Sequence, residues 1–140
     1  MKNVILYIWQ LPQNLLGLAI IKLCKGKLHF LKSEGDPHLS WRYYIIDSSL
    51  IKCSVALGKY IIAPVKNKDK ETTMRHEWGH TKQSLMFGPL YLLVIGLPSV
   101  IRNRISVRKK KPSSWYYGYA PDMGTAYPEK WADKLGGVKR

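Results

Sequence analysis

One short pattern constrains this chain more than any other, because it fixes both a local structure and a chemistry. Two histidines four residues apart, His76 and His80, enclose Glu77 in the stretch HEWGH. The segment around this pattern predicts a helix over residues 69–87, which ends at the Gly-Pro pair at positions 88–89. Side chains four residues apart lie one above the other on the same face of a helix. The pattern therefore predicts that both imidazoles can reach one cation.

The residue types in this pattern match those of a hydrolytic zinc site. Histidine nitrogens bind zinc at about 2.0–2.1 Å. Glu77 is rotated by about 100° from His76 around the helix, so it reaches a water held on the metal more easily than the metal itself. That water, with its pKa lowered by zinc, can give a proton to Glu77 and attack a carbonyl. Composition alone gives the H-E-x-x-H pattern an expected count of about 0.003, so we interpret it as a zinc site with Glu77 as the general base.

A catalytic zinc site needs a third protein ligand. The extended pattern H-E-x-x-H-x-x-G-x-x-H is absent, because positions 83 and 86 are Gln and Met. A second short helix is predicted over residues 128–135, and it carries Glu129 and Asp133 on one face. The chain has 23 Lys and Arg against 9 Asp and Glu, a net charge of +14, so a pair of carboxylates at helical spacing is informative.

The two helices together resemble the gluzincins, the thermolysin-like zinc metallopeptidases, which pair an H-E-x-x-H helix with a later helix carrying E-x-x-x-D. The residues that carry the resemblance are HEWGH at 76–80 and EKWAD at 129–133, well under half of the chain. The resemblance implies that Glu129 is the third Zn²⁺ ligand and that Asp133 orients His76 through its second nitrogen. It also implies a minimal zincin-like domain, lacking the large second domain of thermolysin, that hydrolyses peptide or protein substrates.

Two further positions on the active-site helix bear on this interpretation. Gln83 lies seven residues after His76 on the ligand face, where it either bonds to a ligand or remains an exposed amide. Gly79 is unfavourable by about 1 kcal/mol in a helix interior, and a close approach of the helix that carries Glu129 would explain it.

The reaction also needs a hydrogen-bond donor for the oxyanion that forms during attack. Four tyrosines in the C-terminal third are candidates: Tyr116, Tyr117, Tyr119 and Tyr127. Tyr127 lies nearest to Glu129 in the sequence and is therefore the assigned candidate.

The rest of the chain predicts an α+β fold in a single domain of 140 residues. Residues 27–65 hold alternating and branched stretches separated by turn residues, and they predict a short antiparallel sheet packed on the active-site helix. Gly58 marks a hairpin or a bulge. The stretch KYIIAPV at 59–65 is the candidate for an edge strand that extended substrate joins, or it is an ordinary strand of the sheet.

Two apolar segments allow two interpretations each. Residues 11–23 predict an apolar N-terminal helix that is either buried in protein or lies in a membrane interface. Residues 88–113 predict an apolar hairpin, or a buried helix, followed by a basic loop. The apolar and basic residues of 85–111 together form a candidate contact with an anionic membrane surface. The alternative function is therefore a membrane-peripheral zincin-like binding protein without proteolysis.

Charge and cysteine content bear on the partners and the cellular compartment of the protein. The net charge of +14 favours acidic partners, but no helix-turn-helix, zinc-finger or RNA-recognition signature is present, so nucleic acid is not an expected partner. Cys24 and Cys53 either pair or remain free thiols, and two cysteines favour a reducing compartment. We therefore expect a cytoplasmic protein, with peripheral membrane association as a further expectation.

Overall fold

The computed structural model describes residues 2–30, 43–65, 71–112, 116–117 and 127–139. Its strands form one sheet in the order β1-β2-β4-β3, from β1 (Lys27–Phe30), β2 (Tyr44–Ser48), β3 (Val55–Leu57) and β4 (Tyr60–Pro64). The β1–β2 and β3–β4 pairs are antiparallel, the latter joined at Gly58 as a hairpin, whereas β2 and β4 run parallel. The α+β class is confirmed, but the expectation of a wholly antiparallel sheet is wrong. The chain runs back along β3 before it enters β4, so β4 has the same direction as β2.

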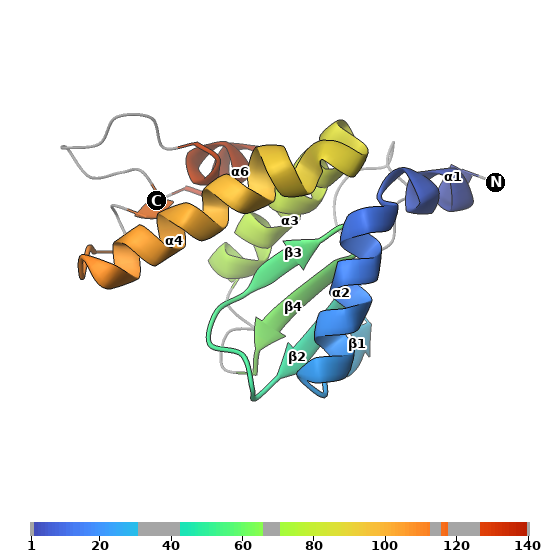
Figure 1. Cartoon of the computed structure of the whole chain (residues 1–140), viewed down its shortest axis with the longest axis horizontal. Coiled ribbons are helices and arrows are strands. Elements are labelled where there is room, and N and C mark those ends of the chain that lie inside the picture. Colours follow the sequence, from blue (N-terminus) through green and yellow to red (C-terminus); the bar gives the residue numbers. More distant parts are fainter. Residues whose placement is uncertain (1, 31–42, 66–70, 113–115, 118–126, 140) are drawn as a thin grey trace.

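Helices cover the sheet, as Figure 1 shows. They are α1 (Lys2–Trp9), α2 (Leu11–Leu23), α3 (Glu71–Phe87), α4 (Leu97–Arg108) and α6 (Glu129–Gly136). Between α3 and α4 the chain stays helical through a 3-10 turn, η1 (Gly88–Leu90), and a π-helical stretch, η2 (Leu92–Gly96). We call η1, η2 and α4 together the helical run. The helices predicted over 11–23 and 128–135 are found within one residue of those bounds. The helix predicted over 69–87 is described from Glu71 onward, since 66–70 lie outside the described residues.

The central strands are buried on both faces, which explains their nearly continuous apolar sequences. Ile46 and Ile62 point toward a core that α2 completes with Ile20. Their neighbours Ile45 and Ile61 point to the other face, where Met74 of α3 packs against them. The sheet is thus held between α2 and α3 and provides a rigid support for the site residues of α3.

The helical run takes the place of the hairpin and basic loop expected over residues 88–113. Pro89 and Pro98 each occupy the first turn of a helical segment, where a missing N–H is tolerated, so the chain continues instead of turning back. The expectation of a buried helix is also wrong for one side of the run. More than half of the surface is exposed in Leu90, Leu93 and Leu97.

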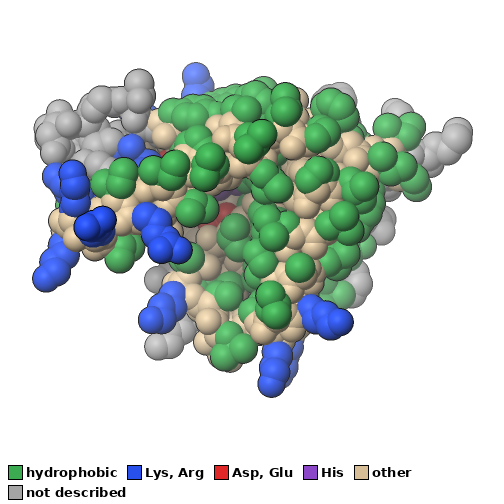
Figure 2. Space-filling model, in the orientation of Figure 1, with side chains coloured by type: hydrophobic (Ala, Val, Ile, Leu, Met, Phe, Trp, Pro, Cys, Tyr) green, Lys and Arg blue, Asp and Glu red, His purple; other side chains and the backbone are tan. Residues whose placement is uncertain are grey.

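The first part of helix α2 directs polar residues inward and leucines outward, whereas Ile20 near its end packs on the core. Gln10, Gln13 and Asn14 are fully buried, while Leu15 is 54% and Leu18 is 42% exposed. Figure 2 shows the resulting cover of hydrophobic side chains over α2. One of the two expectations for this helix was that its apolar side chains are buried in protein. That expectation is wrong for these leucines.

Hydrogen bonds explain the burial of Gln13 and Asn14, which form the polar stripe of α2. The side-chain amide of Gln10, just before α2, has no hydrogen-bond partner among the described residues. Gln13 Nε2 donates to Ser84 Oγ at 3.0 Å and to the Gly88 carbonyl at 2.8 Å, which joins α2 to the end of α3. Asn14 Oδ1 accepts from the Lys59 backbone N–H at 2.8 Å, at the turn between β3 and β4. Buried polar groups are stable when they are paired in this way. The stripe therefore acts as a polar seam between α2, α3 and the sheet.

Two observations concern membrane-spanning helices and the state of the two cysteines. Among the helices of the described residues, none combines the length and the apolarity needed to cross a bilayer. Cys24 is buried and Cys53 is exposed, and the two are free thiols.

Candidate metal centre

The candidate site depends on a close approach of α3 and α6. A Cβ added to Gly79 would lie 1.9 Å from the Ala132 carbonyl oxygen, and one added to Gly136 would lie 1.9 Å from that of Arg75. The two helix backbones therefore touch at both glycines, which is the close approach expected from Gly79. Helix α6 ends at a left-handed residue, Gly137, with φ +69°.

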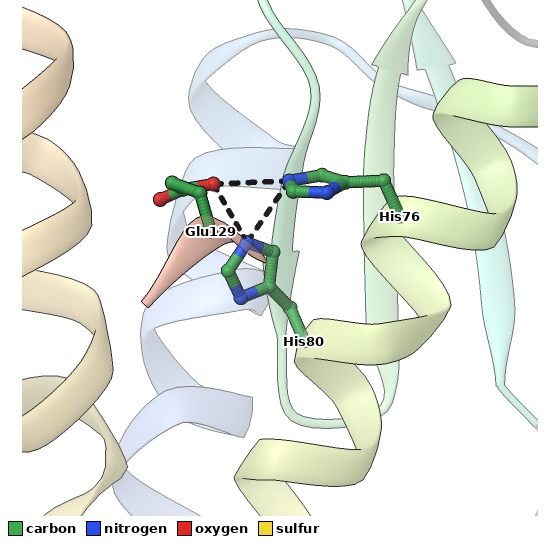
Figure 3. A group of neighbouring side chains, drawn as sticks. All are labelled: His76, His80 and Glu129. Atoms are coloured by element: carbon green, nitrogen blue, oxygen red, sulfur yellow. Dashed lines mark hydrogen bonds and ion pairs between the residues drawn. The ribbon is translucent and has the colours of Figure 1, made fainter. Parts of the chain in front are cut away.

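This contact brings His76 and His80 of α3 together with Glu129 of α6 (Figure 3). Glu129 Oε2 lies 3.0 Å from His76 Nε2 and 3.3 Å from His80 Nε2, and the two nitrogens are 3.2 Å apart. Ligand atoms at about 2.0–2.1 Å from a tetrahedral zinc ion are about 3.3–3.4 Å from one another. The three separations therefore suit a single ion of that size.

The outer nitrogen of each histidine meets an oxygen acceptor. His76 Nδ1 lies 2.7 Å from Asp133 Oδ1, and His80 Nδ1 lies 2.7 Å from Gln83 Oε1. The orientation of the Gln83 amide follows from its other end, because Gln83 Nε2 donates to the Pro128 carbonyl at 3.3 Å. Acceptors at both Nδ1 atoms favour the proton there, which leaves the Nε2 lone pairs directed at one another and at Glu129.

Two lone pairs and a carboxylate directed at one point require a positive charge between them. All three side chains are buried, with Glu129 fully so, and Glu129 Oε1 has no hydrogen-bond partner among the described residues. The set of two imidazoles and one carboxylate is a donor set that metal ions take in hydrolytic enzymes. His76, His80 and Glu129 therefore form a buried group that could hold a metal ion.

The pKa shifts of His76 and Glu129 also indicate that the site needs a positive charge. For His76, burial lowers the pKa, but the hydrogen bonds to Asp133 and Glu129 outweigh burial and raise the pKa to about 9. For Glu129, burial acts to raise the pKa, but hydrogen bonds from His76 and His80 hold it well below its usual range. Protein groups alone would thus attract a proton to the site. A metal ion bound there would displace that proton, so its affinity would depend on pH.

Glu77 lies beside these ligands, at a cavity of about 360 Å³ that His76 and His80 also line. Only 6% of Glu77 is exposed. Burial is the largest cause that raises its pKa, the charge of Glu129 adds to it, and the two histidines oppose it. A carboxyl group at a cavity wall with a raised pKa can both accept and return a proton.

The structure does not bring Tyr127, the tyrosine assigned from sequence proximity, to this cavity. Its hydroxyl donates to the Val94 carbonyl, its ring stacks on Trp131, and it is absent from the cavity lining. Nearness to Glu129 in sequence was misleading, because Tyr127 lies before the start of α6 and its hydroxyl bonds to η2 instead of facing the ligands.

Among the described candidate tyrosines, Tyr116 is the one in the cavity lining. Its hydroxyl lies 3.4 Å from Ser99 Oγ. Burial, and then the negative charge of Glu129, raise the pKa of Tyr116 and keep it a proton donor. Tyr117 contacts His76 edge to face at 4.9 Å, and Tyr119 lies outside the described residues.

The edge strand beside α3 is β3, not β4. The strand order places β4 between β2 and β3, so the stretch KYIIAPV is interior and its assignment as the edge strand is wrong. Val55, Ala56 and Leu57 of β3 line the cavity, and the Tyr91 hydroxyl donates to the Ala56 carbonyl at 3.0 Å. The strand nearest α3 in sequence is thus not the strand that borders the cavity.

Comparisons of the chain with family models, with curated proteins and with solved structures found no match.

Proposed function

We propose that the protein is a zinc-dependent metallopeptidase. The observation that carries the proposal is the convergence of His76, His80 and Glu129, with their outer atoms held by Asp133 and Gln83. This donor set matches hydrolytic zinc sites, which use three protein ligands and leave a fourth position for water. The adjoining cavity supplies room for a substrate beside Glu77.

Each nearby side chain then has a chemical role. A zinc ion held by His76, His80 and Glu129 would supply a water of lowered pKa and would polarise the substrate carbonyl. Glu77 accepts the proton of the attacking water and returns it to the leaving amine. Tyr116 donates a hydrogen bond to the oxygen that gains negative charge. Asp133 and Gln83 keep the histidine rings in the orientation that binding needs.

The edge strand gives a place for an extended peptide. A peptide laid along β3 would add a strand to the sheet and pass the cavity beside Glu77. Tyr91 already bonds the Ala56 carbonyl. Within β3, pairing would therefore begin at the Ala56 N–H, the other outward backbone group of the strand.

The test is a comparison of zinc content and casein cleavage in variants of the full chain. Wild-type protein should hold about one zinc ion, and His76→Ala and Glu129→Ala should lose it. Glu77→Gln should keep the zinc and lose activity by about 10²–10⁴-fold. Glu71→Gln is the matched control, because Glu71 lies on the same helix with its side chain exposed, and it should behave as wild type.

Two results would overturn the proposal. One is a correctly folded protein that takes up no zinc when the ion is supplied. The other is peptide cleavage by Glu77→Gln at the wild-type rate.

A further inference from the structure

The cavity beside the metal centre opens between α2 and the helical run. Leu16 and Ile20 of α2 line one side, and Leu92, Leu97 and Val100 of the run line the other. Figure 2 shows hydrophobic side chains on both sides of this hollow, with histidine and acidic side chains visible at its bottom. We call the exposed apolar side chains of α1, α2 and the helical run the apolar face.

The apolar face is an organised surface and not a scatter of single residues. Along the run, Leu90, Leu93, Leu97 and Val100 recur every three or four residues and are all more than half exposed. In α1, Ile5 is 65% exposed and is flanked by other exposed apolar residues of that helix. A continuous apolar surface of this kind marks an interaction site.

The interior side of these helices is already committed to the protein. The polar stripe of α2 bonds to α3 and to the sheet through Gln13 and Asn14. In the run, Tyr91 and Ile95 are buried, and Tyr91 bonds to β3. Within the described part of the chain, no other element is left to cover the exposed apolar side, which is therefore free to meet a neighbour.

The charge around the apolar face selects the kind of neighbour. The sequence has no Asp or Glu in residues 1–33 or 78–121, which contain all three parts of the face. Exposed basic residues lie at its ends, including Lys22 in the last turn of α2, Lys25 after it, and Arg104 and Arg108 in α4. Figure 2 shows Lys and Arg around the margin of the hydrophobic surface. A second copy of the chain also has a net charge of +14, so two copies would repel each other, whereas anionic lipid carries the opposite charge.

We propose that the apolar face lies on an anionic lipid bilayer, with the cavity mouth toward the lipid. The helices lie in the interface, as amphipathic helices with basic flanks do, and their basic residues contact lipid headgroups. A substrate that reaches Glu77 then comes from the membrane side, which selects peptides anchored in the bilayer. This last step rests on the proposed peptidase function, whereas the docking itself does not.

Vesicle binding tests the docking. Wild-type protein should co-sediment with phosphatidylcholine vesicles that contain phosphatidylglycerol, bind vesicles of phosphatidylcholine alone at least tenfold less, and release as salt rises. The double variant Leu93→Glu/Val100→Glu should bind anionic vesicles at least tenfold less than wild type. Leu28→Glu is the matched control, because Leu28 is an exposed leucine of β1, outside the apolar face, and it should bind normally.

A polarity-sensitive fluorophore gives a second readout that leaves the charge of the face unchanged. In a Cys53→Ser background, the label is attached at Leu93→Cys on the face or at Lys130→Cys on α6. The label at position 93 should shift to the blue on anionic vesicles, and the label at 130 should not. Equal shifts at both positions, wild-type binding by the double glutamate variant, or no vesicle binding at low salt would each overturn the proposal. So would a stable dimer that the double variant dissociates, because the face would then belong to a second copy.

Docking and catalysis can fail separately in these experiments. Glu77→Gln should bind vesicles as wild type does, because Glu77 lies inside the cavity. A peptide carrying an acyl anchor should be cleaved at least tenfold faster on anionic vesicles than the same peptide without the anchor. Vesicle binding without cleavage of either peptide would leave the docking intact and contradict the peptidase function. Cleavage of both at one rate would contradict delivery from the membrane.

Discussion

At the scale of single residues, the two histidines of the site are held by different partners. His76 faces a carboxylate, Asp133, whereas His80 faces a neutral amide, Gln83. A carboxylate makes an imidazole a stronger base than an amide does, so His76 should contribute more to metal affinity. The fully buried Asp133 is therefore the residue through which affinity can be changed without removing a ligand.

We expect Asp133→Asn to lower zinc affinity by about 10–100-fold with little change in fold, because the ring keeps an acceptor but loses the negative charge. Competition against a chromogenic chelator measures the affinity. Lys134→Gln, an exposed substitution one residue along α6, serves as the control. Unchanged affinity in Asp133→Asn would show that the carboxylate does not tune the ligand.

Tyr116 and Tyr127 are expected to differ in whether their hydroxyl groups stabilise the oxyanion. Tyr116→Phe should lower kcat by about 10²-fold with little effect on KM, because a donor to the developing charge acts in the transition state. Tyr127→Phe should leave kcat unchanged, since its hydroxyl is bonded to the Val94 carbonyl. Steady-state kinetics on one peptide distinguish them, and a larger loss in Tyr127→Phe would restore the assignment made from sequence.

At the scale of elements, the contact of α3 with α6 decides whether the site forms. Gly79→Ala gains about 1 kcal/mol of helix propensity, but its methyl group would lie 1.9 Å from a backbone oxygen of α6. Overpacking costs about 1–3 kcal/mol, and a backbone obstacle cannot rotate away, so the cost lies at the upper end of this range. After the gain in propensity is subtracted, we expect a net loss of about 2 kcal/mol. Thermal unfolding of the metal-free proteins measures it.

Gly96→Ala is the matched control for this substitution. Its added Cβ would meet no atom closer than 3.7 Å, so it should leave stability unchanged or raise it slightly. An equal loss in both variants would mean that helix packing at Gly79 is not the cause.

Several elements were predictable because their ends carry strong local signals. Pro12, the Gly-Pro pair at 88–89 and Gly137 stop or start helices for steric reasons that need no tertiary context. The direction of β4 relative to β2 was not predictable, since a strand buried on both faces has the same sequence pattern in either orientation. The choice between a buried and an exposed apolar side of α2 stayed open, because apolar content alone does not reveal that Gln13 and Asn14 have partners in α3 and the sheet.

At the scale of the whole molecule, metal binding and folding should be coupled, because the site exists only when α3 and α6 are packed. Zinc at about 1,000 times its dissociation constant should raise the free energy of unfolding by about 4 kcal/mol. Glu129→Gln should lose most of this increase, and Glu71→Gln should keep it. Denaturant unfolding with and without zinc measures the effect. A full zinc-dependent increase in Glu129→Gln would place the ion elsewhere.

The site itself was largely predictable because its chemistry is encoded at fixed spacings. His76, Glu77 and His80 are brought together by one helix, and the pair Glu129 and Asp133 by another. Tyr116 could not be chosen from the sequence, because its place in the cavity comes from contacts with Ser99 and Arg102 of α4 and from no spacing to the ligands. Spacing within one helix is readable in a sequence. The meeting of α3 and α6 was expected only because Gly79 and the resemblance pointed to it, and no such signal placed Tyr116.

The separation of His76 from Glu129 by 53 residues has a consequence for chain topology. An ion bound to both residues would act as a cross-link that closes a loop of this length. A covalent cross-link of such a loop restricts the unfolded chain by about 4 kcal/mol, and a coordinate bond acts in the same sense. The closed loop contains the helical run and Tyr116, so one ion would anchor both ends of the segment that carries much of the apolar face. Removing the ion would then loosen the attachment of that segment as well as stop the chemistry.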